Sequence, residues 1–306
     1  MQRYLLTRLI QSSLLLFGVV VLVFLMVRMT GDAASLLIAR DFADPTQLEA
    51  MRDALGLNDP IYVQFVSYLR SVASGELGYS LRFRQPAIEV ILAALPITLL
   101  LSTVAMGIAL LVAVPLGIAG GYSPNTWIDA LARGVGLVGQ VTPSFWLALM
   151  LIWFFAVNLR VLPSFGIDGP QSFVLPAFAL SIGAMGQLTR LTRSTVLEIR
   201  GEDYIRTARS KGLSGSAIGL HHIARNASVA LVSVVGIQFT YLMAGSVYIE
   251  SVFAIPGIGW MLNEAIRNRD FVLVQSLTIF IASFAILFNL ATDVVYVLLD
   301  PRIRYG

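Results

Sequence analysis

The most prominent pattern in the sequence is a series of long apolar stretches separated by shorter polar ones. A transmembrane helix takes about 20 mostly apolar residues, and six stretches are long enough. They cover residues 9–29, 95–118, 131–159, 173–191, 229–249 and 272–299. The third and sixth are longer than a straight span needs, so we expect them to be tilted or kinked. The pattern predicts an all-α membrane protein with six transmembrane helices, the last five forming a core over residues 95–299.

The composition excludes most other classes of protein. The chain is 57% hydrophobic and 13% charged, with a mean hydropathy of +0.79, whereas a soluble domain carries about 25% charged residues. A soluble enzyme, a disordered chain and a repeat array are therefore excluded. The chain has no cysteine, and its only histidines, His221 and His222, are adjacent. We therefore expect no metal site of ordinary ligand spacing.

The placement of arginines predicts the orientation. Six spans put both termini on one side of the membrane. The tails 1–8 and 300–306, the short loop near Arg133 and the long loop 192–228, taken from Arg190, carry twelve basic residues, against three in the two short loops opposite. The positive-inside rule makes the first set cytoplasmic. The opposite loop 30–94 has five more arginines, but it is too long for the rule to apply.

The loop 30–94 is predicted to be periplasmic and helical. Asp-Pro opens and glycine closes each of two segments, Asp44-Pro45 to Gly56 and Asp59-Pro60 to Gly75, as expected of capped helices. The second segment has one apolar face, formed by Ile61, Phe65, Leu69 and Val72. These helices either cap the outer mouth of the bundle or form a docking surface for an external partner.

Several motifs resemble catalytic or nucleotide-binding patterns but lack the neighbouring strands or residues that those patterns require. Gly134, Gly136 and Gly139 match G-x-G-x-x-G, but they lie inside a predicted span with no strand before them. We interpret these glycines, and the pair Gly117 and Gly121, as sites of close helix packing. The only lysine, Lys211, is followed by glycine, so the chain lacks a Walker A loop. We expect no catalytic residue and no ATPase activity of its own.

Few ionisable groups fall inside the spans. Asp293 lies in the sixth span, Glu250 at the outer end of the fifth, and Arg28 at the end of the first. Such groups are functional candidates by default. A single acid within a span argues against a proton-coupled carrier. Asp293 is also consistent with a residue near the interface that pairs helices, and its role stays open.

The loop 192–228 contains a short helical pattern with its own caps. Glu202 and Asp203 begin it, basic residues end it, and Gly212 follows. Acids at the start and bases at the end of a helix complement its dipole. The segment is either a docking element for a cytoplasmic partner or a solvated loop kept basic for topology.

These residues resemble a known family. The sequence DYIRTARSKGL at 203–213, with His222 and RNA at 225–227, is similar to the cytoplasmic EAA loop of bacterial ABC importer permeases, most of all the dipeptide, oligopeptide and nickel branch. The resemblance extends over the chain, through residues 55–60, 75–80, 95–99, 142–147, 250–259 and 300–304. At the motif's first position, RTA at 206–208 stands in place of Glu-Ala-Ala, and the later Leu-Pro is absent. Both departures put the glutamate contact of other importers in doubt, but not the docking role.

The resemblance implies a multi-pass permease subunit of the bacterial inner membrane. It would form the translocation pathway with a second permease, couple to two separate cytoplasmic ATPase subunits that hold ATP and Mg, and receive substrate from an external binding protein. Di- or oligopeptides are the expected substrate, with glutathione or a nickel chelate as alternatives and a secondary carrier as the less favoured class. The coupling candidates are Glu202, Asp203, Tyr204, Arg206, Thr207, Ala208, Arg209, Lys211, Gly212, Arg225 and Asn226.

The segment after the fifth span is a candidate external gate. Apolar residues there are interrupted by one proline and two glycines, which suggests a re-entrant turn whose backbone needs protein partners. Such a turn would line the gate and meet the binding protein, and a plain connecting loop is the alternative. The candidate residues are Phe253, Ile255, Pro256, Gly257, Ile258 and Gly259.

Overall fold

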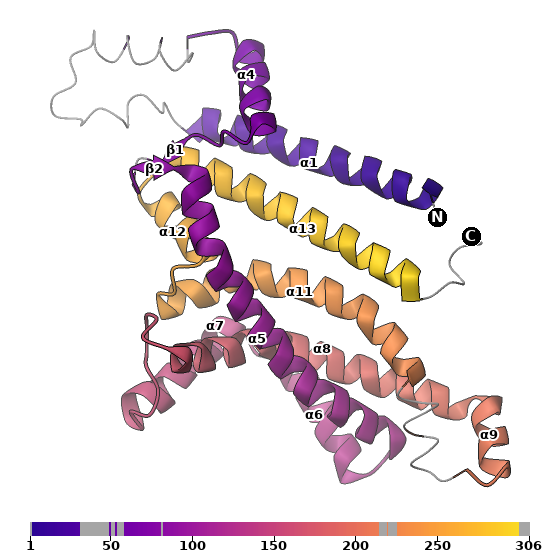
Figure 1. Cartoon of the computed structure of the whole chain (residues 1–306). Helices are drawn as coiled ribbons and strands as arrows, with labels where there is room; N and C mark the ends of the chain where they lie inside the picture. The colour runs from indigo at the N-terminus through magenta and orange to yellow at the C-terminus, as the bar shows by residue number, and fades with distance from the viewer. Residues whose placement is uncertain are drawn as a thin grey trace. The chain divides into compact units, whose positions relative to one another are not determined.

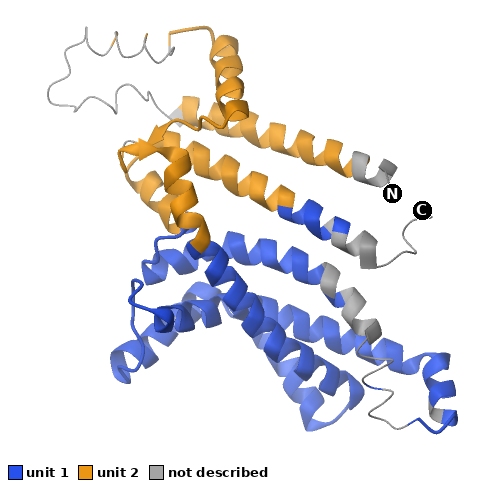
Figure 2. Ribbon diagram, in the orientation of Figure 1, with its two compact units in different colours: residues 1, 97–259, 288–306 blue, residues 2–96, 260–287 orange. Residues whose placement is uncertain are grey.

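The computed structural model describes residues 2–30, 58–80, 82–213 and 225–299, together with Glu49, Asp53 and Gly219. The described chain is almost entirely helical (Figure 1). It divides into two units, coloured separately in Figure 2: unit 1 holds residues 97–259 and 288–306 with Met1, and unit 2 holds residues 2–96 and 260–287. The helices are α1 (Gln2–Thr30), α4 (Ile61–Ser74), α5 (Ala87–Tyr122), α6 (Trp127–Val141), α7 (Ser144–Leu151), α8 (Val174–Gly201), α9 (Asp203–Ser210), α11 (Arg225–Phe253), α12 (Ile258–Arg267) and α13 (Phe271–Leu299).

The helices long and apolar enough to cross a membrane agree with the six predicted spans. Four single helices pass by length and composition: residues Thr7–Met29, Ala87–Tyr122, Pro170–Gly201 and Phe271–Thr292. Two bent pairs, α6 with α7 and α11 with α12, pass when each pair is taken together. Counting each pair as one span gives six in the described part of the chain, as the apolar pattern predicts.

The third predicted span is broken. Helix α6 ends at Val141, and α7 continues as a π-helix over Ile152–Asn158, at an angle of 101° to α6. Thr142, between them, is extended (φ −85°, ψ 115°) because the ring of Pro143 disfavours a helical residue before it. Of the tilt or kink expected in this long stretch, the structure shows a kink, in the form of a full break.

Glycines allow the helices of unit 1 to pack closely. Helix α8 contacts α6, α7 and α11. A Cβ added at Gly139 on α6 would lie 2.7 Å from Gly186 Cα, and one at Gly121 on α5 would lie 2.7 Å from Val196 Cβ on α8. Both distances are shorter than real Cβ contacts. The interpretation as sites of close helix packing is confirmed for Gly139, Gly117 and Gly121, but it is wrong for Gly134, where an added Cβ would meet nothing within 4 Å.

Unit 2 contains the second predicted helix of the 30–94 loop. Helix α4 begins after Pro60 and ends at Gly75, which is left-handed with φ 79°. Its half-buried Phe65 packs against Phe24 of α1 with ring centroids 5.1 Å apart. Ile61 was expected on the same face but is 57% exposed. The first predicted helix, Asp44-Pro45 to Gly56, lies outside the described residues apart from Glu49 and Asp53.

A buried aspartate in unit 2 joins the start of α13 to a short hairpin. Strands β1 (Tyr79–Ser80) and β2 (Gln85–Pro86) pair antiparallel. The Ser80 hydroxyl donates a 2.6 Å hydrogen bond to Asp270 Oδ2, and the Arg82 backbone N–H donates to the same oxygen. Asp270 Oδ1 accepts from Leu273 N, which caps α13. The sequence pattern gave no sign of this contact.

Candidate functional site

The predicted docking helix is present as α9. It runs over Asp203–Ser210, and Gly212 follows in the left-handed conformation with φ 81°. The hydrogen bond from Leu213 N to Ala208 O closes its last turn. Helix α8 continues ten residues past the predicted end of the span at 191 before α9 begins, so the first ten residues of the predicted 192–228 loop belong to α8.

The apolar side of α9 packs against other helices of the same chain. Ile205 and Ala208 are 1% and 7% exposed, and they form a small core with Val196 of α8. Partly buried residues pack around this core, namely Ile118 and Tyr122 of α5 and Ile199 of α8. Ala208, one of the coupling candidates, therefore faces inward and packs against its own chain. The packing fixes α9 to the ends of α5 and α8.

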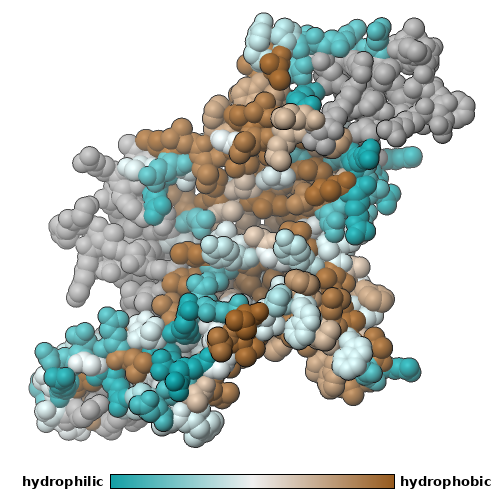
Figure 3. All heavy atoms as spheres, turned by 180° about the vertical axis from the view of Figure 1, so that it is seen from behind, coloured by the Kyte–Doolittle hydropathy of each residue, from teal (hydrophilic) through white to brown (hydrophobic). Residues whose placement is uncertain are grey.

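The opposite side of α9 is open and polar. Tyr204 is 42% exposed, and the exposed Asp203 and Arg206 form an ion pair at 3.4 Å. Hydrophilic side chains gather at the end of unit 1 that carries α9, as Figure 3 shows. The exposed coupling candidates are Glu202, Asp203, Tyr204, Arg206, Thr207, Lys211 and Gly212. His221, His222 and the side chains of Arg209, Arg225, Asn226 and Asp293 lie outside the described residues.

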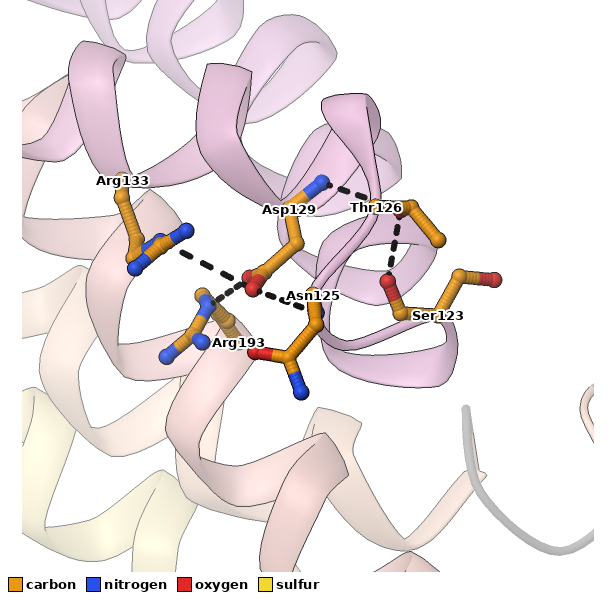
Figure 4. Close-up of polar contacts among 6 residues, drawn as sticks. All are labelled: Ser123, Asn125, Thr126, Asp129, Arg133 and Arg193. Atoms are coloured by element: carbon orange, nitrogen blue, oxygen red, sulfur yellow. Dashed lines mark hydrogen bonds and ion pairs between the residues drawn. The ribbon is translucent and has the colours of Figure 1, made fainter.

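A buried carboxylate joins the α5–α6 connection to α8 (Figure 4). Asp129, in the first turn of α6, exposes 1% of its side chain. It accepts hydrogen bonds from Arg193 Nε on α8 and, at 3.0 Å, from Asn125 N. Arg133, one turn further along α6, approaches Asp129 to 3.6 Å and stays 57% exposed. Thr126 caps α6 by accepting from Asp129 N.

This ion pair joins the start of α6 to α8 near α9. Arg193 lies on the same stretch of α8 that supports α9, and Asp129 stands where α5 turns into α6. The carboxylate receives charge-assisted bonds, which are stronger than neutral ones. Next to α9, the ends of α5 and α8 are linked by apolar packing, and the start of α6 is linked to α8 by the ion pair. Sequence reasoning missed the pair because its partners are 64 residues apart.

The candidate gate segment forms a tight turn over residues 254–257, between α11 and α12. Glu250, near the end of α11, is fully buried. Its Oε1 accepts a 2.7 Å hydrogen bond from the Thr98 hydroxyl on α5, and its Oε2 accepts one of 2.8 Å from Gly259 N. Thr98 Oγ1 accepts in turn from Ile258 N. This set of bonds, which we call the Glu250 clasp, satisfies backbone N–H groups just after the turn.

The structure places most gate candidates in the interior of the chain. Phe253, Ile255 and Ile258 are 1%, 0% and 3% exposed, Gly257 and Gly259 are buried, and Pro256 is half-buried. A Cβ at Gly257 would lie 2.5 Å from both the Glu250 carboxylate and Thr98 Oγ1, so only glycine fits. Ala254 is exposed and left-handed with φ 50°. The segment is a packed turn, and its role at a gate stays a hypothesis.

A pocket of about 600 Å³ lies within unit 1, between α6, α7, α8 and α11. Its lining is polar but carries no charged side chain. The lining residues are Gly139, Gln140, Thr142, Ser144, Leu180, Ile182, Gly183, Ala184, Gln187, Gln238, Tyr241, Leu242 and Gly245. Sequence reasoning missed the three glutamines because each lies in a different apolar stretch or at its edge.

The described residues contain no group of three or more His, Cys, Asp or Glu side chains placed to hold a metal ion. The polar clusters that they do form, around Asp129, Glu250 and Asp270, consist of hydrogen bonds that join one helix or turn to another. These arrangements bind and position helices, and we assign them no chemical step.

Comparison with known proteins gives similarity over the full chain. The family model described as "Binding-protein-dependent transport system inner membrane component" matches residues 113–305, and the model for the N-terminal part of such components matches residues 1–102. A putative peptide transport system permease of Brucella abortus is 37% identical over 313 residues, covering all of both chains. The glutathione transport system permease of Escherichia coli is 36% identical, and the dipeptide transport system permease of Alkalihalophilus pseudofirmus 34%, both with full coverage of both chains.

Solved structures share the fold at lower identity. A chain of an inward-facing methionine ABC transporter aligns with a TM-score of 0.56 and 19% identity, covering 70% of this chain and 97% of that one. A chain of an amino acid ABC transporter aligns with a TM-score of 0.53 and 20% identity, covering 70% and 94%. Both similarities concern the arrangement of helices.

Proposed function

This chain belongs to the family of inner membrane components of binding-protein-dependent transport systems, and on that premise we propose that it is one of the two permease subunits of an ATP-driven importer of short peptides. The observation that carries the proposal is the full-length similarity to permeases named for peptide and dipeptide transport. That similarity covers the spans, the α9 segment and the turn at 254–257 together, so it concerns the whole permease and not one motif.

The α9 helix supports the proposed coupling to separate ATPase subunits. Its apolar side is fixed to α5 and α8, and its exposed side carries Tyr204, Arg206 and Thr207. A short helix held in this way moves as a unit with the helices that carry it. Closure of an ATPase dimer against α9 would therefore shift α5 and α8 directly. The excess of arginines in the predicted cytoplasmic segments favours an orientation with α9 and both termini inside the cell.

A permease subunit of this kind needs further subunits in order to transport substrate. A second permease would complete the pathway, two ATP-binding subunits would supply the energy, and an external binding protein would deliver substrate. Glutathione is the second candidate, because a glutathione permease is as similar to this chain as the peptide permeases are. Glutathione is itself a tripeptide, so the two candidates call for related recognition chemistry.

Reconstitution tests the proposal. The chain would be purified with its second permease and ATPase pair, placed in liposomes and supplied with the binding protein. ATP-dependent uptake of labelled trialanine is expected, and uptake should require the binding protein. Labelled glutathione and Ni²⁺ are assayed in parallel. Uptake of glutathione or Ni²⁺ without trialanine would replace the peptide assignment, and uptake driven by a proton gradient without ATP would refute the importer.

A further inference from the structure

One residue that lines the pocket between α6, α7, α8 and α11 has a hydrogen-bond donor without a partner among the described residues. Gln238 on α11 is 4% exposed, and among the described residues its Nε2 has no hydrogen-bond partner. A buried amide without a partner is costly, so such groups in folded proteins call for an explanation. Gln238 lines the pocket, so a turn of its buried side chain would bring this donor to a ligand there.

A second amide of the pocket is oriented by an arginine. Gln140 Oε1 accepts a 3.0 Å hydrogen bond from Arg190 Nη1. A guanidinium has no acceptor, so the oxygen end of this amide must face Arg190 and its NH₂ end must turn away. The pocket lining thus holds two amide groups, Gln140 and Gln238, able to donate, from helices α6 and α11.

Two residues of the pocket lining, Gly183 and Gln187, belong to a polar stripe along α8. Between residues 183 and 198 the exposed positions of this helix fall every three or four residues, and therefore on one face. None of them is apolar apart from glycine, although Gly183 and Gln187 lie inside the predicted span 173–191, whereas Ser194 and Glu198 lie beyond its end. Lipid would not favour such a face, and a water-filled pathway would. The exposed residues are Gly183, Gln187, Arg190, Ser194 and Glu198.

We propose that this pocket is a binding site within the membrane for a short peptide, in which the amide groups of Gln238 and Gln140 donate to the substrate's backbone carbonyls. A peptide backbone offers uncharged acceptors whatever its side chains are. The lining has amides and hydroxyls but no carboxylate or imidazole, so it does not suit a bare cation. Its volume lies within the range of about 300–1,000 Å³ found for small-molecule sites. The inference rests on the proposed function, since it names the substrate contact of the same importer.

Equilibrium binding tests the site without requiring transport. The complex of this chain with its second permease and ATPase pair is placed in nanodiscs without binding protein, and tritiated trialanine is the probe. Gln238→Leu removes the donor, and Gln238→Glu replaces it with an acceptor. Each should weaken trialanine binding about three- to tenfold, the effect of losing one neutral hydrogen bond. Ser102→Ala is the matched control, because the Ser102 hydroxyl is also buried without a partner among the described residues but does not line the pocket.

The outcomes separate the site from the function. Weaker binding in both Gln238 variants, with Ser102→Ala unchanged, supports the site. The site is refuted if the wild-type complex shows no saturable trialanine binding, if the Gln238 variants bind as well as wild type, or if Ser102→Ala weakens binding equally. ATP-driven uptake in liposomes is measured separately. Trialanine binding that depends on Gln238, without any ATP-driven uptake, would leave the site standing and overturn the proposed function.

Discussion

The hydroxyl of Thr98 donates a 2.7 Å hydrogen bond to the carboxylate of Glu250, although 152 residues separate them in the sequence. Both side chains are buried, and they join α5 to the end of α11. The same hydroxyl accepts from Ile258 N, so Thr98 is both a donor and an acceptor in the Glu250 clasp. The turn at 254–257 is therefore held by side chains that lie outside the turn itself.

Removing the Thr98 hydroxyl should destabilise the clasp. Thr98→Val keeps the shape of the side chain but leaves a carboxylate oxygen and the Ile258 N–H without this partner. Leaving a buried polar group unsatisfied costs about 1–3 kcal/mol. The apparent melting temperature of the purified importer should fall by several degrees. Thr98→Ser keeps the hydroxyl and is the control. Equal melting temperatures for the two variants would show that the clasp contributes no stability.

Two glycines of α6 provide a matched test of helix packing. A Cβ at Gly139 would lie 2.5 Å from Ile182 O and 2.7 Å from Gly186 Cα, whereas one at Gly134 would meet nothing within 4 Å. Gly139→Ala should force α6 and α8 apart, and overpacking of this kind typically costs about 1–3 kcal/mol. Gly134→Ala should be neutral or stabilising by up to about 1 kcal/mol, because alanine favours helix. Thermal unfolding of the two variants checks this, and a fall for Gly134→Ala equal to that for Gly139→Ala would contradict it.

The two arginines beside Asp129 should differ in their contribution to stability. Arg193 is 22% exposed and hydrogen-bonded to the carboxylate, whereas Arg133 is 57% exposed and 3.6 Å away. Exposed ion pairs contribute about 0–1 kcal/mol, and breaking a buried pair costs about 3–5 kcal/mol. Arg193→Ala should therefore lower the melting temperature clearly more than Arg133→Ala does. High salt should change the Arg133 effect more, because water and ions screen exposed charges. The reverse order would show that Arg193 contributes little.

The sequence was sufficient for features that depend on neighbouring residues. Apolar length predicts the spans because a bilayer sets a minimum helix length. The bounds of α4 and α9 follow from local caps, namely Pro60 and Gly75 for α4 and Asp203 and Gly212 for α9. The close packing at Gly139 is also foreseeable, since small residues in a span favour close helix approach.

Contacts between distant segments could not be predicted from the sequence. Glu250 finds Thr98, and Asp270 finds Ser80 from 190 residues away, only once the helices have packed. An apolar side on a short helix can be covered by a partner or by its own chain, and no local pattern separates the two. This is why Ala208 reads as a partner contact in the sequence, whereas in the structure it packs against α8.

The contrast between Thr207 and Ala208 gives the sharpest test of the docking face. The chain has no cysteine, so a single introduced cysteine reports one position. Thr207→Cys places the thiol on the exposed side of α9, and Ala208→Cys places it in the core with Ile205 and Val196. In the assembled importer, a short cysteine-to-amine cross-linker should join Thr207→Cys to an ATPase subunit. Ala208→Cys, the adjacent control, should give little product, because its side chain is 7% exposed and cannot reach the reagent. Equal cross-linking from both positions would mean that α9 separates from α5 and α8 in the assembled importer. No cross-linking from Thr207→Cys would mean that the ATPase docks elsewhere.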